Sequence, residues 1–447
     1  MIFIQNYHKH SSFSNIWGFY DSAAINEDYA KRAVELGHKV ISSVEHGFQG
    51  NYHQCYELAQ KYDLKFVFGV EAYWVRDRQA EYPVIDKTTG KEKLKKDGTV
   101  QMAKDRNNNH IIILAKNENG RQAINDILSE ASETGYYFRP RIDLDLILNL
   151  PSNDVLVTTA CVAFWRYDDI DEIVLKLHNH FEDNFYLEIQ YHDTDTQRKL
   201  NQHILDLSKQ YGIEMIVGLD SHYIYPSQSK EREYMMLTNG SHYDDDGEIG
   251  WYMDYPDDET VMQRFLEQGI FNRKQIQKAM DSTDVLLTFD DYDVLPDGST
   301  NPVFSKDIKL PSLYDGEHII DGIEFPKLTQ TERNKEYSKL ISKLFKRYMK
   351  NIPKEEYNRY YQGVKEEVSV IKDTNMSDYF LIDYYIVKKA LEKGAVLTNS
   401  GRGSAVSYFT NTLLGFSKVD RFQSPIKLYP ERFISKSRII ESKSLPD

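Results

Sequence analysis

Two histidines close to the start of the chain are spaced so that they can act together. His8 and His10 follow a short apolar run at residues 1–4. On an extended backbone, side chains two residues apart point to the same side, so the two imidazoles can converge on one point. Neutral imidazoles bind zinc well and manganese acceptably. A polar strand end is the plainer interpretation of one His-x-His pair, and later positions in the chain must decide.

Further side chains that can bind a metal stand at or just past the carboxyl ends of other predicted strands. They are His46, Glu71, Cys161, Asp220 and His222. Some have ordinary alternatives: a turn residue for His46, a small buried hydrophobe for Cys161 and a helix cap for Asp220. Because the carboxyl ends of parallel strands share one face, we expect imidazole, carboxylate and thiolate groups to meet there.

The elements that would position these residues alternate between strand and helix patterns. Seven strand candidates, the last at 213–223, are separated by helical patterns such as 27–36, 51–62 and 118–132. This alternation predicts an α/β fold of parallel βα units, most simply a closed or nearly closed barrel. Residues 77–109 are polar and predict an exposed hairpin or loop without assigned chemistry.

The composition excludes several classes of protein. A chain of 447 residues with 40% hydrophobic residues is expected to form two or three domains with substantial cores. Its net charge of −14 argues against coating nucleic acid through bulk charge. Two cysteines, with no signal peptide and no apolar run long enough to span a bilayer, favour a reducing compartment. We therefore expect a cytoplasmic protein without a membrane partner.

The motifs around these ligands resemble those of the polymerase and histidinol phosphatase (PHP) domain. They are H-x-H-S-x-F-S from His8, E-H-G at His46, G-V-E at Glu71, N-H-x-x-x-L-A-K-N at His110 and D-x-H at Asp220. The resemblance implies a distorted seven-stranded βα barrel, similar to a TIM barrel, with up to three metal ions. The nine ligands that it implies are His8, His10, Asp21, His46, Glu71, His110, Cys161, Asp220 and His222.

Three positions depart from the pattern of that family or fit it less simply. Asp21 lies in an altered, lengthened loop after the first strand. His110 starts its strand, the wrong end for a simple barrel, so only the resemblance identifies it as a ligand. Glu45 replaces the more usual Asp before the histidine, which we expect to matter little. The eight other histidines are interpreted as surface or packing residues; among them are His53, His178, His180 and His192.

The implied metal site favours phosphoester hydrolysis. Two or three divalent ions, with zinc as the first candidate and manganese or iron as alternatives, would lower the pKa of water and stabilise the displacement. The resemblance implies a 3′–5′ proofreading exonuclease in which Asp220 and His222 are catalytic. An inactive structural scaffold and a stand-alone phosphoesterase of the histidinol-phosphatase type are the alternatives.

A second region is predicted towards the C-terminus, giving domains at 1–290 and 291–447. The strongest linker signal is at 296–302 (PDGSTNP), and helical patterns follow at 354–372 and 379–392. The basic helical run at 331–350 either faces DNA phosphates or is a solvated helix face.

A glycine-rich turn follows a predicted strand at 395–398 and precedes a helix, an arrangement that can cradle a phosphate. A tight turn would need the same glycines. With the segments 377–387 (SDYFLIDYYIV) and 428–447 (LYPERFISKSRIIESKSLPD), it resembles the palm of C-family replicative DNA polymerases of the polymerase III alpha type. The resemblance implies an α+β, nucleotidyltransferase-like palm. The residues that would bind the incoming dNTP are Gly401, Arg402, Gly403, Ser404 and Arg432.

The last residue, Asp447, matches the first of two catalytic palm carboxylates that hold magnesium in that family. With the second carboxylate absent, we expect an incomplete palm that cannot extend a primer alone, in a polymerase that is truncated or naturally split, for example at an intein boundary. The expected partners are a DNA primer–template, a dNTP, and a C-terminal polymerase fragment carrying the remaining palm, the thumb and the fingers. A sliding clamp would bind through that fragment, and magnesium would join the completed palm.

Overall fold

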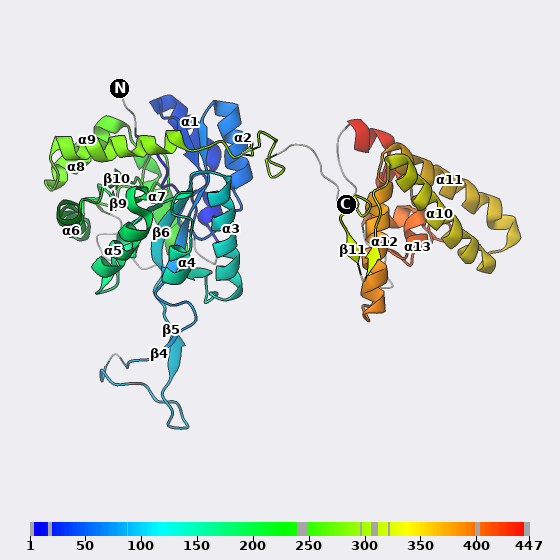
Figure 1. Ribbon diagram of the computed structural model, residues 1–447, viewed down its shortest axis with the longest axis horizontal. Coiled ribbons are helices and arrows are strands. Elements are labelled where there is room, and N and C mark those ends of the chain that lie inside the picture. Colours follow the sequence, from blue (N-terminus) through cyan, green and yellow to red (C-terminus); the bar gives the residue numbers. More distant parts are fainter. Residues whose placement is uncertain are drawn as a thin grey trace. The chain divides into compact units, whose positions relative to one another are not determined.

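The chain divides into two compact units, Met1–Ser305 and Lys306–Asp447 (Figure 1). The computed structural model describes residues 4–16, 20–86, 88–238, 249–295, 297–304, 312–320, 322–397 and 403–441. Tyr292 and Phe304, which the sequence assigned to the second region, pack in the core of the first unit. Each unit is described by itself.

The first unit is an α/β fold, and its helices follow the periodic segments of the sequence. They are α1 (Asn26–Leu36), α2 (Tyr52–Tyr62), α3 (Glu118–Glu133), α4 (Leu144–Leu148), α5 (Ile170–Phe181), α6 (Asp195–Tyr211), α7 (Ser229–Thr238), α8 (Asp258–Gln268) and α9 (Arg273–Asp281). The ends of these helices have local causes. Gly37 ends α1 in the left-handed conformation, and the Asn117 side chain caps α3 by accepting a hydrogen bond from the Gly120 amide.

The strands of this unit follow one another around a common centre. They are β1 (Val40–Ser42), β2 (Lys65–Val67), β3 (Gly69–Val75), β6 (Asn109–Ala115), β7 (Arg141–Asp143), β8 (Val155–Thr158), β9 (Phe185–Ile189) and β10 (Met215–Val217). Six of them form one sheet in the order β10-β9-β8-β6-β3-β7, and β1 pairs with β2. Single bridges, Lys9 to Ser221 and His46 to Glu71, extend this arrangement at both sides. The Ser42 hydroxyl donates to the Tyr7 carbonyl over 2.7 Å, which joins the N-terminal segment to β1.

The expectation of parallel strands throughout is wrong for β6. This strand runs antiparallel to both of its neighbours, β3 and β8, whereas β8 and β9, and β9 and β10, are parallel. The first predicted strand is also not formed in its described part, where residues 4–10 contribute only the bridge at Lys9. The reversal of β6 places its amino end beside the carboxyl ends of the other strands.

The core has an outer and an inner layer, and β6 separates them. Ile111 and Ile113 belong to the cluster that includes residues of the surrounding helices, while Ile112 and Leu114 belong to a smaller cluster that also contains Tyr7. A strand buried on both faces needs a continuous apolar run, which explains the sequence at 111–115. Side chains with the parity of Ile112 therefore point to the inner layer.

A hairpin of β4 (Glu81–Pro83) and β5 (Met102–Lys104) projects from the first unit (Figure 1). Its two strands pair antiparallel, and all of the side chains of β4 are exposed. The segment 77–109 thus contains the exposed hairpin that its polar sequence predicts.

The second unit is mostly helical. Its elements are β11 (Ile319–Ile320), β12 (Ile323–Glu324), α10 (Gln330–Tyr348), α11 (Tyr357–Asp373), α12 (Ser377–Glu392) and α13 (Phe409–Leu414). Its core includes Tyr337, Ile341 and Phe345 from the buried face of α10. The strand expected at 395–398 is not formed in its described part, residues 395–397. None of the described helices of either unit is long and apolar enough to cross a membrane.

Candidate metal centre

His8 and His10 lie on the N-terminal segment, which pairs with the loop after β10. The His10 amide donates to the Ser221 carbonyl over 2.8 Å, and the Ser221 amide donates to the His8 carbonyl over 3.2 Å. This parallel pairing aims both imidazoles at one carboxylate. Nε2 of His8 and Nε2 of His10 lie 3.1 Å and 3.4 Å from Oδ1 of Asp220.

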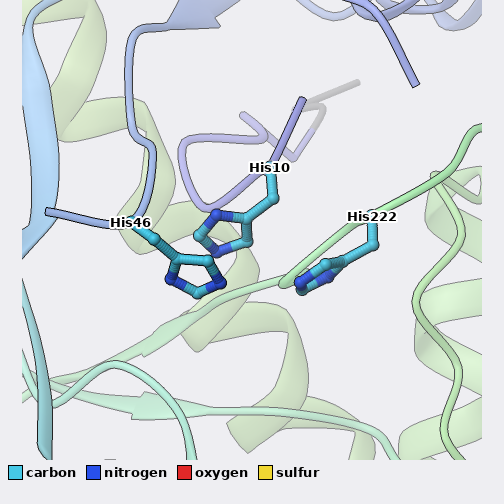
Figure 2. Close-up of side chains that lie close together, drawn as sticks. All are labelled: His10, His46 and His222. Atoms are coloured by element: carbon cyan, nitrogen blue, oxygen red, sulfur yellow. The ribbon is translucent and has the colours of Figure 1, made fainter. Parts of the chain in front are cut away.

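Three imidazoles from three different parts of the chain, those of His10, His46 and His222, lie close together (Figure 2). His10 belongs to the N-terminal segment, His46 to the loop after β1 and His222 to the loop after β10. The ring of His10 lies 4.0 Å from that of His46 and 4.5 Å from that of His222, measured between centroids. One ring nitrogen from each of the three lies within 4.8 Å of the others.

Glu71 joins this group to His110. One carboxylate oxygen of Glu71 lies 2.6 Å from Nδ1 of His46, and the other lies 2.8 Å from Nδ1 of His110. The sequence placed Glu71 at a strand end, but the residue lies inside β3, opposite Ile112 of β6. His110 is the second residue of β6 and has the parity of Ile112. Because β6 runs antiparallel to its neighbours, its amino end lies beside their carboxyl ends, so His110 stands at the same end as the other ligands.

The last two predicted ligands complete the group. Oδ2 of Asp21 lies 3.2 Å from Nε2 of His46 and 3.3 Å from Nε2 of His222. The Asn15 side chain fixes this loop, because its carbonyl oxygen accepts hydrogen bonds from the amides of residues 21 and 22. Sγ of Cys161 lies 3.4 Å from Nδ1 of His110. The structure thus brings all nine predicted ligands together.

One ligand and the residue before another have an unusual backbone. Asp220 and Ala160, the residue before Cys161, have φ values of 46° and 48°. Residues other than glycine rarely adopt this left-handed region, and they persist there only where the surroundings enforce it. The strain therefore coincides with the points where the chain must turn a side chain towards the centre.

The charges in the centre balance one another. Burial by itself would raise the pKa of Asp21, but the imidazoles of His222 and His46 hold it well below its usual value. Burial would lower the pKa of His8, whereas the carboxylates of Asp220 and Glu188 raise it well above its usual value. Burial therefore opposes the charged form of both groups, and the opposite charges beside them favour it.

The side chains present fit divalent metal ions. Nε2 of His8, Nε2 of His10, Nδ1 of His46 and Oε2 of Glu71 are buried, and although each lies within 2.6–3.4 Å of an oppositely charged neighbour, none makes a hydrogen bond of normal geometry. Buried polar atoms normally have partners, so these atoms leave a need that an ion would meet. Nitrogen, carboxylate and thiol donors together suit zinc or similar ions. Three overlapping triads can be formed: His10–His46–His222, His8–His10–Asp220 and His46–Glu71–His110.

Sequence patterns did not identify Glu188, a carboxylate that holds one of the ligands in place. Oε1 of the buried Glu188 lies 2.6 Å from Nδ1 of His8. Its other oxygen accepts hydrogen bonds from the Tyr7 hydroxyl and the Thr158 hydroxyl, at 2.7 and 2.8 Å. A single charged residue in the otherwise apolar strand at 185–189 was the available signal.

Glu45 supports the centre from another side. It is buried and accepts hydrogen bonds from the Lys9 ammonium at 2.9 Å and from the Ser14 hydroxyl at 2.5 Å. Ser14 in turn contacts Nδ1 of His10 over 2.9 Å. His192, interpreted as a surface or packing residue, is buried, and burial lowers its pKa to about 4 against the opposing effect of Asp220.

The predicted nucleotide site is only partly described. Gly401, Arg402 and Asp447 lie outside the described residues. Gly403 has a φ of 76°, and the segment Ser404–Ser407 is a 3-10 turn instead of the start of an α-helix. The Ser404 hydroxyl is buried without a hydrogen-bond partner, while Arg432 is exposed on a 3-10 turn that packs against Ser404–Ser407.

Two protein families match separate parts of the sequence. The family described as PHP domain matches residues 6–192, and the family described as bacterial DNA polymerase III alpha NTPase domain matches residues 336–447. Among solved structures, an amidohydrolase from Chromobacterium violaceum is 13% identical and covers 52% of this chain and 96% of its own, but its TM-score of 0.33 is too low to establish a shared fold.

Curated relatives match nearly the whole chain. The DNA polymerase III subunit alpha of Helicobacter pylori is 26% identical over 98% of this chain and 34% of its own length. The subunits of Aquifex aeolicus and Thermus aquaticus are each 24% identical over 98% of this chain, and the matches cover 35% and 37% of their lengths. The chain thus spans about a third of the relatives that it matches.

Proposed function

This chain is a homologue of the N-terminal part of DNA polymerase III alpha subunits, a PHP domain followed by a DNA polymerase III alpha NTPase domain, and from this premise we propose that its first unit hydrolyses phosphodiesters of DNA. The convergence of nine ligand-competent side chains on one centre supports the proposal. The finer activity that we propose is 3′–5′ exonucleolytic cleavage. The strands that surround the centre are proposed to form the distorted seven-stranded barrel of the PHP type.

The residues of the centre would bind the ions and hold them in place. When bound, two or three divalent ions would activate water and neutralise the charge that develops on the phosphoryl oxygens. Burial opposes the charges of Glu71 and Asp220, but the surrounding imidazoles keep the pKa of both carboxyl groups well below its usual value. Both therefore remain anionic ligands at neutral pH. We propose Asp220 and His222 as the residues that act in catalysis.

The test uses the full chain, single-stranded DNA labelled at its 5′ end, and manganese or zinc. We expect shortening from the 3′ end, and we expect Asp220→Asn to abolish it without loss of the folded state in circular dichroism. Asp206→Asn, the same change at an exposed position on α6, is the matched control and should retain activity. Equal rates in the parent and Asp220→Asn would identify a contaminating nuclease instead.

The same assay separates the two alternatives. Hydrolysis of a small phosphate monoester without cleavage of DNA would favour a phosphoesterase of the histidinol-phosphatase type. Bound metal without either activity would favour a structural scaffold. The described centre favours the hydrolytic proposal because it retains every ligand of the implied set.

For the second unit, we propose part of a polymerase palm, which binds the incoming dNTP. The exposed guanidinium of Arg432, beside the turn that begins at Ser404, supports this proposal. Gly401, Arg402 and Gly403 would supply backbone amides, and Asp447 would hold magnesium once the palm is completed. Primer–template DNA, a complementary polymerase fragment and, through it, a sliding clamp are the proposed partners. A fluorescent dNTP should bind the parent more tightly than Arg432→Gln.

The basic face of α10 supports DNA binding by the second unit. Six exposed cations extend along this face and the 3-10 turn Met349–Asn351 that follows it: Lys335, Lys339, Lys343, Lys346, Arg347 and Lys350. Lys339 pairs with Glu336 at 2.6 Å, whereas the last four cations make no ion pair within the described residues. They concentrate positive charge on a chain of net charge −14. At ~1.5 Å per residue the row is about 22 Å long, enough to follow several phosphates of one strand.

Salt dependence tests this face. A variant with Lys343, Lys346 and Arg347 all changed to Gln should bind primer–template DNA more weakly. Its slope of log K against log salt should be smaller by about 2 to 3, because each lost phosphate contact removes roughly 0.9. The matched control changes Lys176, Lys199 and Lys209, exposed on α5 and α6, in the same way and should keep the parental slope. An unchanged slope in the α10 variant would assign this face to solvent.

A further inference from the structure

The metal centre is partly open on the side of His110 and Cys161. The side chains of His8 and His10 have no exposed surface, whereas the side chains of His110 and Asp220 are 16% and 10% exposed and Cys161 is 9% exposed. His110 and Cys161 lie where the amino end of β6 meets the segment after β8. His110 is the most exposed of these ligands, so the segments around it are candidates for contact with the rest of the substrate.

The loop at 135–140 borders this side. It leads into β7, whose first residue, Arg141, pairs with Tyr73 of β3, and Tyr73 pairs with His110 on the other side. The guanidinium of Arg139 lies 4.6 Å from the centre of the Tyr73 ring. That ring lies 5.3 Å from the His110 ring and 5.9 Å from the His46 ring. A single aromatic side chain therefore separates the positive charge of Arg139 from two metal ligands.

Phe138, in the middle of this loop, has a backbone conformation and an exposure that are unusual for an aromatic residue. Its φ of 62° lies in the left-handed region, where glycine or asparagine is usual, and its side chain is 70% exposed. The backbone around it is fixed by the bridge between Tyr137 and Arg139, and the Tyr137 ring contacts the Phe138 ring at 4.7 Å. The loop thus holds an apolar ring in water, on a strained backbone, next to Arg139, which contacts Tyr73 near the centre.

We propose that the loop at 135–140 binds the single strand that the metal centre cleaves, with Phe138 stacked on an unpaired base and Arg139 contacting a neighbouring phosphate. Exposed aromatic rings next to positive charge bind single-stranded nucleic acid without sequence preference, because every base has a flat face. Stacking needs an unpaired base, so the loop favours single-stranded and mispaired ends over duplex. The inference rests on the proposed phosphodiester hydrolysis.

The experiment measures binding in EDTA, where hydrolysis cannot occur. Fluorescence anisotropy of the full chain gives Kd for an oligo-dT and for an abasic oligonucleotide of equal length. Phe138→Gly removes the ring and still permits the left-handed backbone, so backbone strain does not confuse the result. We expect this change to raise Kd for oligo-dT by about 5- to 150-fold, the range for loss of one stacked base, and to change Kd for the abasic strand much less.

Further variants sharpen the result. Phe138→Trp should restore the preference for oligo-dT over the abasic strand, and Arg139→Gln should weaken binding of both. Tyr211→Ala, which removes an exposed aromatic side chain at the end of α6, should leave both Kd values at the parental level. Equal effects of Phe138→Gly on the two strands, or no binding of oligo-dT by the parent, would overturn the proposal. Parental binding with this base-dependent difference, but without hydrolysis in manganese, would support the loop and refute the nuclease.

Discussion

Replacing Glu188 by Gln removes one negative charge from behind the metal centre with little change of shape. Glu188 is buried and contacts four side chains: Oε1 lies 2.6 Å from Nδ1 of His8 and 3.0 Å from Nε2 of Gln190, and Oε2 accepts from Tyr7 and Thr158. Glutamine can still accept a hydrogen bond from His8. The change therefore removes the charge that orients the ring and increases its basicity, while packing is preserved.

The size of the effect follows from this contact. Partners that hold the second nitrogen of a ligating imidazole typically contribute 10- to 100-fold in metal affinity, which is about 1.4–2.7 kcal/mol. The contact between Glu188 and His8 is short, so we expect a loss in the upper half of this range. His8 lies next to Asp220, and a less firmly held His8 ring should also weaken the ion that these two residues share.

Competition of the metal-free chain with a zinc-binding dye measures the affinity directly. Glu188→Gln should bind zinc about 30- to 100-fold more weakly than the parent at the same pH. Glu214→Gln is the matched control, because Glu214 is half exposed and pairs only with Lys278 at the surface, 2.6 Å away. Equal zinc affinity in Glu188→Gln and the parent, with both chains folded, would show that His8 does not bind metal through its other nitrogen.

Three further predictions concern the free energy of unfolding. In Gly218→Ala the new Cβ would lie 1.9 Å from Oε1 of Glu188, so we expect urea unfolding to show a loss of about 1–3 kcal/mol and zinc binding to weaken. In Gly212→Ala the new Cβ has no heavy atom within 4 Å, so zinc binding should remain unchanged. The pKa of His192 is about 4 in the folded chain and about 6.5 when unfolded, so the unfolded state binds more protons between these pH values. The free energy of unfolding should therefore fall by about 1.4 kcal/mol per pH unit as pH drops through that window, and His192→Gln should lose this part of the slope. Phe345→Ala should cost the second unit about 3–5 kcal/mol in thermal unfolding and leave zinc binding intact, because all nine ligands belong to the first unit. Loss of zinc binding in this variant would contradict that expectation.

Periodicity predicted the helices because their buried faces repeat at helical spacing, and it predicted most strands because they are short apolar runs. It could not give strand direction. The apolar run at 111–115 is equally compatible with either direction, so the reversal of β6 and the resulting position of His110 came only from the structure. The sequence from 65 to 75 is one apolar pattern, whereas the structure divides it at Phe68 into β2 and β3. The position of Glu71 inside β3 was therefore missed.

The supporting residues of the centre were beyond pattern analysis for a different reason. Glu188 is about 180 residues from His8 in sequence, so their contact depends on strand order alone. Glu45 was noticed only as a substitution within a motif, although it is buried and binds Lys9 and Ser14. The sequence around Phe138 is that of an ordinary loop, and only the backbone angle and the exposure of Phe138 distinguish this residue.

Anomalous X-ray diffraction from crystals of the full chain grown with zinc tests the central claim most directly. We predict two or three strong anomalous peaks, bonded to side chains among the nine ligands, with one peak between His10, His46 and His222. The peaks should disappear or weaken in Asp220→Asn crystals of the same form. A folded chain without anomalous density in this centre, at zinc concentrations that saturate other zinc proteins, would contradict the account.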